Sequence, residues 1–282
     1  MTPAPEGLLL VDKPSGMTSH DAVEVVRRSL GTRKVGHAGT LDPMATGLLV
    51  LGVGRATRLL RYLGELPKTY AATGRLGEET DTLDADGEIV RTAPVNVSLA
   101  EVERACASLV GESMQAPPAY SAVRVGGRRL YEAARRGEVL EARPRPIRVD
   151  AFAVSAFDGR DLEARVTCSG GTYVRVLVAD VGRSLGCGAH LVRLRRTAIG
   201  SFLVEDARPP GQGALEPVER AVRHLPGIRL EQEEARAASH GRPLGPAGIV
   251  GAYAVFDPED ALVGVYRDEG AMGRPEVILP RR

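Results

Sequence analysis

A polar, glycine-rich loop constrains this chain more than any other feature of its sequence. The loop runs from Gly36 to Gly47, and the stretch that follows, 48–53, is apolar and strand-like. Pro43 biases Asp42 toward an extended backbone, and the glycines allow another chain or a ligand to approach closely. Because a polar loop between core elements is a common place for chemistry, we expect the Asp42 carboxylate to stand at the end of a rigid turn.

The spacing of this loop leaves several roles open for Asp42. A carboxylate there can act as a nucleophile, a general base or a metal ligand, and within the loop only His37 could join it on a metal. A turn-forming Asp-Pro dipeptide and an ordinary polar histidine fit the same residues. Another interpretation takes Gly36–Gly39 as the phosphate-cradling loop of a nucleotidyl transferase or phosphatase, which would depend on magnesium.

Composition restricts the class of protein. With 282 residues, 43% apolar and 26% charged, the chain predicts one large globular domain, alone or with a small module, and excludes disorder. No apolar run approaches the roughly 18 residues that span a bilayer, and Met1–Glu6 carries no export signal. Three scattered cysteines give no zinc or disulfide spacing. We therefore expect a cytoplasmic protein without a membrane segment or a structural metal.

The charges are segregated along the chain although the formal net charge is only +1. The stretch 124–148 holds eight arginines against three glutamates, and 183–196 holds four arginines and no acid. An acidic loop at 78–88 stands against them. This distribution suits a protein that meets phosphates on one face, although an ordinary solvated helix face explains either basic stretch alone.

Hydrophobic periodicity and turn signals predict both strands and helices. Thr18 and Ser98 each precede an acidic residue by three positions, Asp21 and Glu101, which is the pattern of a helix N-terminal cap. Beyond Pro226-Gly227 the pattern indicates a small β-barrel-like module, marginal unless it docks on the main domain. The expected strands cover 7–11, 48–53, 70–76, 147–157, 162–168, 249–256, 261–266 and 277–279, and the expected helices follow Thr18 and Ser98 and cover 130–136, 174–185 and 232–239.

Taken as a whole, the loop and six further segments closely resemble the tRNA pseudouridine synthase B (TruB) family. That family's pattern is Lys-Pro-x-Gly-x-Thr-Ser followed by Gly-His-x-Gly-Thr-Leu-Asp-Pro-x-Ala-x-Gly-x-Leu, and the chain carries both without departure. Seven motifs occur in order over about residues 8 to 200, whereas 228–282 resembles only loosely the small RNA-binding PUA module. The motifs are Lys13–Ser19, Gly36–Leu48, Lys68–Tyr70, Thr80–Asp84, Pro117–Ala122, Gly171–Arg175 and Gly188–Arg196.

The resemblance implies an α+β fold, in which a mixed, mostly antiparallel sheet is flanked by helices and crossed by a cleft. It implies a catalytic domain over 1–225 and a PUA-like RNA-binding module over 228–282. Within the catalytic domain, the basic stretch at about 124–148 resembles the family's RNA-gripping insertion, and its lack of regular patterning suggests that it becomes ordered on binding RNA.

The resemblance also implies roles for single side chains in the isomerisation of uridine to pseudouridine. Asp42 would be the nucleophile, and Arg175 would pair with it and keep it ionised where burial alone would protonate it. Tyr70 would stack on the uracil and take part in removing the proton from carbon 5. On their own, Arg175 also fits a phosphate contact and Tyr70 an aromatic core residue. The other expected substrate contacts are His37 at the displaced nucleotides, Tyr173 and Leu194 around the uridine, and Lys13 and Asp84 near the site.

The implied reaction breaks the bond between uracil and ribose, turns the base and rejoins it through carbon 5, so no cofactor is expected. The implied substrate is the T-arm of tRNA at position 55, whose uridine must leave its stack first. The family suggests a monomer without an obligatory protein partner, with an RNA affinity that falls steeply with salt. A third interpretation, a non-catalytic RNA chaperone that folds tRNA, could coexist with the enzyme on the same surface.

Overall fold

The structure is a computed structural model that describes residues 4–121, 123–138 and 140–279. Ala122, the last residue of the Pro117–Ala122 motif, and the outermost residues of both expected domains lie outside this range. None of the helices in the described residues is long and apolar enough to cross a membrane.

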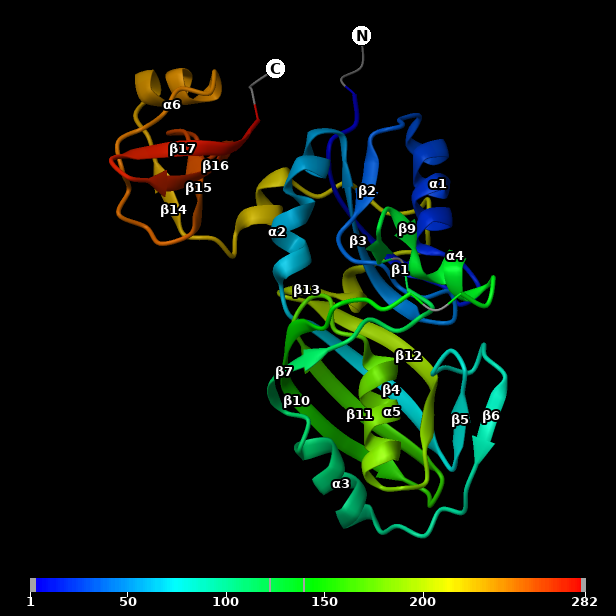
Figure 1. Ribbon diagram of the computed structural model, residues 1–282. Coiled ribbons are helices and arrows are strands. Elements are labelled where there is room, and N and C mark those ends of the chain that lie inside the picture. Colours follow the sequence, from blue (N-terminus) through cyan, green and yellow to red (C-terminus); the bar gives the residue numbers. More distant parts are fainter. Residues whose placement is uncertain (1–3, 122, 139, 280–282) are drawn as a thin grey trace.

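Within the described residues, nine strands form the main sheet, whose central order is β1-β3-β12-β4-β11-β10-β7 (Figure 1). Neighbouring strands are antiparallel except β12 and β3, which run parallel over two register pairs, Arg195 with Thr46 and Arg196 with Gly47. This mixed, mostly antiparallel sheet confirms the predicted fold class. The strands are β1 (Gly7–Lys13), β2 (Val35–His37), β3 (Thr46–Val53), β4 (Lys68–Leu76), β7 (Gly111–Gln115), β10 (Arg145–Phe157), β11 (Asp161–Cys168), β12 (Ala189–Ile199) and β13 (Phe202–Leu203).

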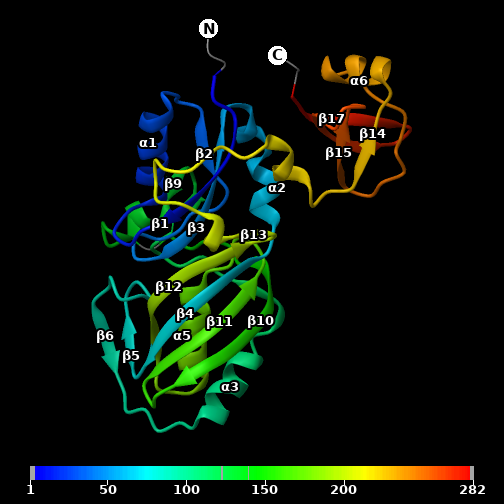
Figure 2. The ribbon, with the colours of Figure 1, turned by 180° about the vertical axis from the view of Figure 1, so that it is seen from behind.

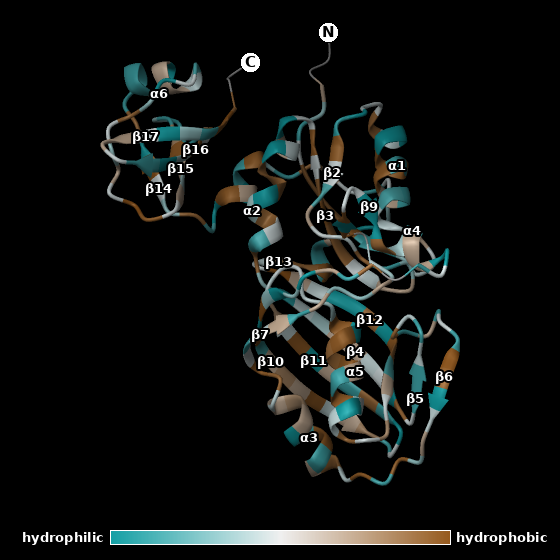
Figure 3. Cartoon of the chain, viewed as in Figure 1, coloured by the Kyte–Doolittle hydropathy of each residue, from teal (hydrophilic) through white to brown (hydrophobic). Residues whose placement is uncertain are grey.

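Helices cover each half of this sheet. The helix α1 (Ser19–Leu30) packs on β1 and β3, and α3 (Leu99–Ala107) and α5 (Val174–Ser184) pack on the other half. Figure 2 shows from behind that α3 and α5 lie on the same face. The helix α5 packs so closely on β4 that a Cβ at Gly74 would lie only 2.7 Å from the Val178 side chain. Apolar residues concentrate in strands such as β3, as Figure 3 shows, and form the core between sheet and helices.

Two excursions leave the main sheet. The hairpin of β5 (Glu78–Thr80) and β6 (Ile89–Thr92) carries the acidic loop. The basic insertion contains β8 (Arg124–Val125), β9 (Arg128–Arg129) and the short helix α4 (Leu130–Ala134), and it overlaps the β1–β3 half in the view of Figure 1. The helix α4 confirms most of the helix expected over 130–136, and the expected ordering of the insertion on RNA stays a prediction.

The C-terminal residues form a separate four-stranded sheet, as the β-rich prediction required. It docks on α2 (Leu60–Glu65), where the Glu276 carboxylate accepts hydrogen bonds from Tyr62 Oη and Arg61 Nη2, both at 2.7 Å. Apolar side chains of both parts, among them Leu63 and Val277, share one buried cluster. The elements of this part are β14 (Gly227–Arg229), α6 (Gln232–Ser239), β15 (Ala252–Phe256), β16 (Leu262–Glu269) and β17 (Met272–Ile278). Earlier in the chain lie the 3-10 turns Gly54–Leu59, Val204–Asp206 and Val218–Val222.

Candidate active site

The loop that carries Asp42 joins β2 to β3 and is fixed on both sides of that residue. Before it, the Leu41 amide donates to Ser19 Oγ at 2.8 Å, and Ser19 Oγ donates back to the Leu41 carbonyl at 3.1 Å. After it, the Gly16 amide donates to the Pro43 carbonyl at 2.9 Å. Gly16 has φ of +78°, a conformation that favours glycine. The motif Lys13–Ser19 thus positions the backbone at Asp42.

Lys13 supports the same loop from behind. Its side chain is fully buried, and its ammonium donates to the carbonyls of Met17 at 2.6 Å, Pro14 at 3.0 Å and Pro43 at 3.3 Å. Burial lowers the pKa of Lys13 to about 8, although the charge of Asp42 opposes this change. Because the ammonium faces backbone carbonyls, the expected contact of Lys13 with substrate stays a prediction.

Asp42 and Arg175, 133 positions apart in the chain, meet in this structure. Arg175 lies in the first turn of α5, and its Nη2 is 3.4 Å from Asp42 Oδ2. The Arg175 side chain is 4% exposed and that of Asp42 is 35% exposed. Burial raises the pKa of the Asp42 carboxyl above its ordinary value, and the Arg175 guanidinium opposes that rise. The site thus holds a partly open carboxyl against a buried cation.

Asp84 binds Arg175 more closely than Asp42 does. Arg175 Nη1 lies 2.9 Å from Asp84 Oδ2, and both side chains are almost fully buried. Asp84 in turn accepts from Thr82 Oγ1 at 2.6 Å. Arg175 Nη2, the nitrogen that faces Asp42, donates to the Tyr120 carbonyl at 2.6 Å. Asp84 therefore orients the guanidinium, and Tyr120 ties it to the segment that precedes the basic insertion. The expected contact of Asp84 with substrate stays a prediction, and sequence reasoning did not single out Tyr120 as a site residue.

Tyr70 lies on β4 and is 6% exposed. It shares a buried cluster with Leu41 and Leu194, the residue expected to line the uridine pocket. Burial raises the pKa of the Tyr70 phenol, the nearby Arg196 guanidinium opposes this rise, and the charge of Asp42 adds to it. The phenol is therefore neutral at physiological pH, and it is close enough to Asp42 to sense its charge.

His37 and Tyr173 are two further residues that the resemblance assigns to substrate contact. His37, on β2, is half-buried; burial lowers its pKa, and its Nδ1 is buried without a hydrogen-bond partner among the described residues. The ring centre of Tyr173 lies 5.9 Å from Arg175 Cζ. The Gln115 side chain accepts from the Tyr173 amide at 2.8 Å and donates to its carbonyl at 3.2 Å. Gln115, which sequence reasoning also missed, thus fixes the turn that leads into α5.

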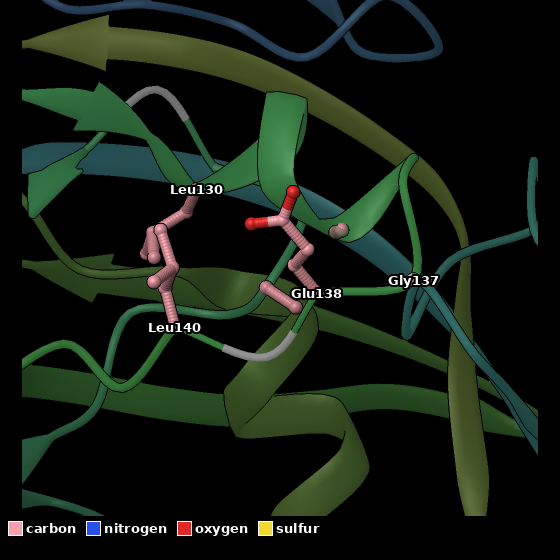
Figure 4. Close-up of a pocket in the computed structure, with 6 residues that line it drawn as sticks. Leu130, Gly137, Glu138 and Leu140 are labelled. Atoms are coloured by element: carbon pink, nitrogen blue, oxygen red, sulfur yellow. The ribbon is translucent and has the colours of Figure 1, made fainter.

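A separate pocket lies in the basic insertion (Figure 4). Among the described residues that line it, Glu138 alone is charged, and its carboxylate pairs with Arg128. The pocket is lined by Ala119, Leu130, Ala134, Gly137, Glu138 and Leu140, none of which belongs to the Asp42 site.

Across the described ranges, no group of three or more histidine, cysteine, aspartate or glutamate side chains could hold a metal ion.

Family models and curated relatives match nearly the whole chain. The model of the TruB family pseudouridylate synthase N-terminal domain matches residues 27–174, that of the tRNA pseudouridylate synthase B C-terminal domain 175–209, and that of the tRNA pseudouridine synthase II C-terminal domain 225–280. The chain is 46% identical over 284 residues to the tRNA pseudouridine synthase B of Mycobacterium sp. (strain KMS), covering 97% of this chain and 96% of the relative. It is 45% identical over 288 residues to that of Thermobifida fusca (strain YX), covering 97% and 98%.

Solved structures show the same fold. A chain in the crystal structure of a Cbf5-Nop10-Gar1 complex matches with a TM-score of 0.76 and 27% identity, over 98% of this chain and 85% of that one. A chain in an H/ACA RNP bound to a substrate RNA containing 2'-deoxyuridine matches with a TM-score of 0.74 and 27% identity, over 98% and 86%. The family models and the shared fold thus place the chain among the pseudouridine synthases. Among these enzymes, the chain belongs to the TruB family, tRNA pseudouridine synthase B.

Proposed function

We propose that this protein isomerises uridine 55 in the T-loop of tRNA to pseudouridine, with Asp42 as the nucleophile. The observation that carries the proposal is the position of the Asp42 carboxyl, which is partly open to solvent on one side and 3.4 Å from the buried Arg175 guanidinium on the other. The relatives named tRNA pseudouridine synthase B support tRNA as the substrate.

The reaction begins when the target uridine leaves its stack and enters the site, at a cost of a few kcal/mol that base contacts recover. Asp42 then bonds to the nucleotide, the bond from uracil nitrogen 1 to ribose breaks, the base turns, carbon 5 bonds to the ribose, and the bond to Asp42 breaks again, which regenerates the carboxylate. Carbon 5 loses one proton and nitrogen 1 gains one, so the reaction is an isomerisation. Tyr70 stacks on the uracil and takes part in the proton removal from carbon 5, and Arg175 keeps Asp42 ionised.

The basic insertion supplies the grip on RNA in this proposal. Three of its eight arginines form ion pairs within the described residues: Arg128, Arg129 and Arg148. The other five have no acidic partner within that part of the chain and can neutralise phosphates, so tRNA affinity falls steeply with salt. We propose that the enzyme acts as a cytoplasmic monomer without an obligatory protein partner, and that the same surface assists tRNA folding.

The test uses a T-arm stem-loop transcript, carbodiimide labelling of pseudouridine and mass spectrometry. We expect one pseudouridine, at the loop uridine that corresponds to tRNA position 55, and none in a matched transcript with cytidine there. Labelling at another uridine instead would refute the substrate assignment. Full activity in excess chelator would exclude the magnesium-dependent phosphate-loop alternative, whereas loss of activity in chelator would favour it.

A further inference from the structure

Arg196 is a fully buried cation, 1% exposed, on β12. Among the residues that the structure describes, no carboxylate lies within ion-pair distance, 4.0 Å, of its guanidinium. Its charge instead helps to lower the pKa values of two other buried cations, Lys13 and Lys68. A buried guanidinium without an acidic partner is costly unless hydrogen bonds replace its water, so its position needs a physical reason.

The hydrogen bonds of Arg196 close the loop that carries Asp42. Its Nε donates to the Leu48 carbonyl at 2.7 Å, and its Nη2 donates to the Gly39 carbonyl at 3.0 Å. Gly39 lies three residues before Asp42, and Leu48 lies six residues after it. One planar guanidinium thus holds both ends of the segment from Gly39 to Leu48 together.

Arg196 also stands at the junction between the two halves of the main sheet. Across β12 it is the register partner of Gly47 on β3 and of Tyr70 on β4. The backbones approach so closely that a Cβ at Gly47 would lie 2.3 Å from the Arg196 carbonyl oxygen. Directly opposed residues on neighbouring strands have side chains within contact range, which places the Arg196 side chain beside the Tyr70 phenol.

We propose that Arg196 is a positioning residue for the isomerisation, which fixes the Asp42 loop relative to Tyr70 across the β3–β12–β4 junction. The inference rests on the proposed function, which assigns the chemistry to Asp42 and Tyr70. Strands β3 and β12 share only two register pairs in the described residues, so backbone pairing alone holds the two halves weakly there. The guanidinium supplies two further bonds at that point.

The arginine fork is needed because its nitrogens are fixed in one plane at a set separation. Lysine keeps the charge but offers a single nitrogen, and glutamine removes the charge. A misplacement of about 1 Å between reacting groups can slow a reaction about 100-fold. We therefore expect the single-turnover rate at saturating tRNA to fall about 10-fold in Arg196→Lys and about 100-fold in Arg196→Gln. The Kd for tRNA should stay within about threefold, because the buried Arg196 side chain does not face the RNA.

The experiment measures the single-turnover rate, the tRNA Kd and the melting curve of wild type, both Arg196 variants and Arg195→Gln. The matched control removes the neighbouring arginine, which pairs with Asp12 at 2.8 Å and 3.0 Å, and should keep the rate within about threefold. The inference is supported if Arg196→Gln lowers the single-turnover rate without weakening tRNA binding, and if Arg196→Lys retains part of the rate that Arg196→Gln loses.

A folded Arg196→Lys enzyme within twofold of the wild-type rate would overturn it, as would equal losses of rate and affinity. If Arg196→Gln does not fold, Arg196→Lys decides alone by the same criterion. Wild-type protein that forms no pseudouridine in tRNA would refute the proposed function instead. If wild type modifies another uridine, the variants are compared at that uridine.

Discussion

The Arg175 guanidinium lies 2.9 Å from Asp84 but 3.4 Å from Asp42. The closer carboxylate is buried with the arginine, and the more distant one is partly open. This division separates two tasks. Asp84 stabilises and orients the buried cation, and Asp42 keeps one side free for a substrate.

Asp84→Asn should destabilise the protein by about 3–5 kcal/mol, because it leaves the buried Arg175 without its closest anion. Urea unfolding at pH 7 measures this change. The control is Asp161→Asn, which breaks the partly exposed pair with Arg75 and should cost about 0–1 kcal/mol. Equal losses of unfolding free energy in the two variants would contradict the claim that Asp84 stabilises the buried Arg175 guanidinium.

The pH dependence of the reaction should reflect the raised pKa of Asp42. The nucleophile must be ionised, so the single-turnover rate falls as the pH falls through a pKa above the ordinary value of 3.8. Stability changes in the opposite direction to the rate. The contribution of Asp42 to the free energy of unfolding falls as the pH rises, because the folded state binds this proton more tightly than the unfolded state does. Asp42→Asn should therefore raise the melting temperature at pH 7, and by less at pH 4. A lower melting temperature at pH 7 would contradict this electrostatic account.

Lys68 should make stability depend on pH in the alkaline range. Its buried ammonium donates to the carbonyls of Gly64 at 2.8 Å and Leu66 at 2.7 Å, and burial lowers its pKa from 10.5 to about 8. Between these two values the unfolded state binds more protons, so stability rises with pH by at most about 1.4 kcal/mol per unit. Urea unfolding of Lys68→Met should lack this contribution, and the exposed control Lys34→Met should keep it. Identical pH profiles for all three proteins would contradict the prediction.

Local signals predicted the secondary structure well. The Thr18–Asp21 and Ser98–Glu101 pairs form capping boxes at the starts of α1 and α3, and the expected helix 232–239 is α6. These elements depend on side chains within a few residues of each other, so the sequence contains the information needed to place them. The strands expected at 147–157 and 162–168 form the antiparallel pair β10–β11. The strands expected at 249–256 and 261–266 are β15 and β16, whereas the one expected at 277–279 overlaps only the end of β17.

Long-range relationships in the site could not be predicted from spacing. The Asp84–Arg175 pair spans 91 positions, and the Arg196–Gly39 bond spans 157. Family resemblance named Asp42, Arg175 and Tyr70, but not the order of distances among the carboxylates. Arg196 lies in a motif that fits a basic surface strand equally well, and only the folded sheet shows that it is buried beside Tyr70.

The most direct test of the central claim is the pseudouridine formed by Asp42→Asn enzyme on the T-arm transcript, beside the control Asp86→Asn, which removes an exposed acid nearby. Asp42→Asn should form no pseudouridine while binding tRNA within a few-fold of wild type, and Asp86→Asn should modify the same uridine as wild type. Pseudouridine formed by Asp42→Asn would contradict the assignment of the nucleophile.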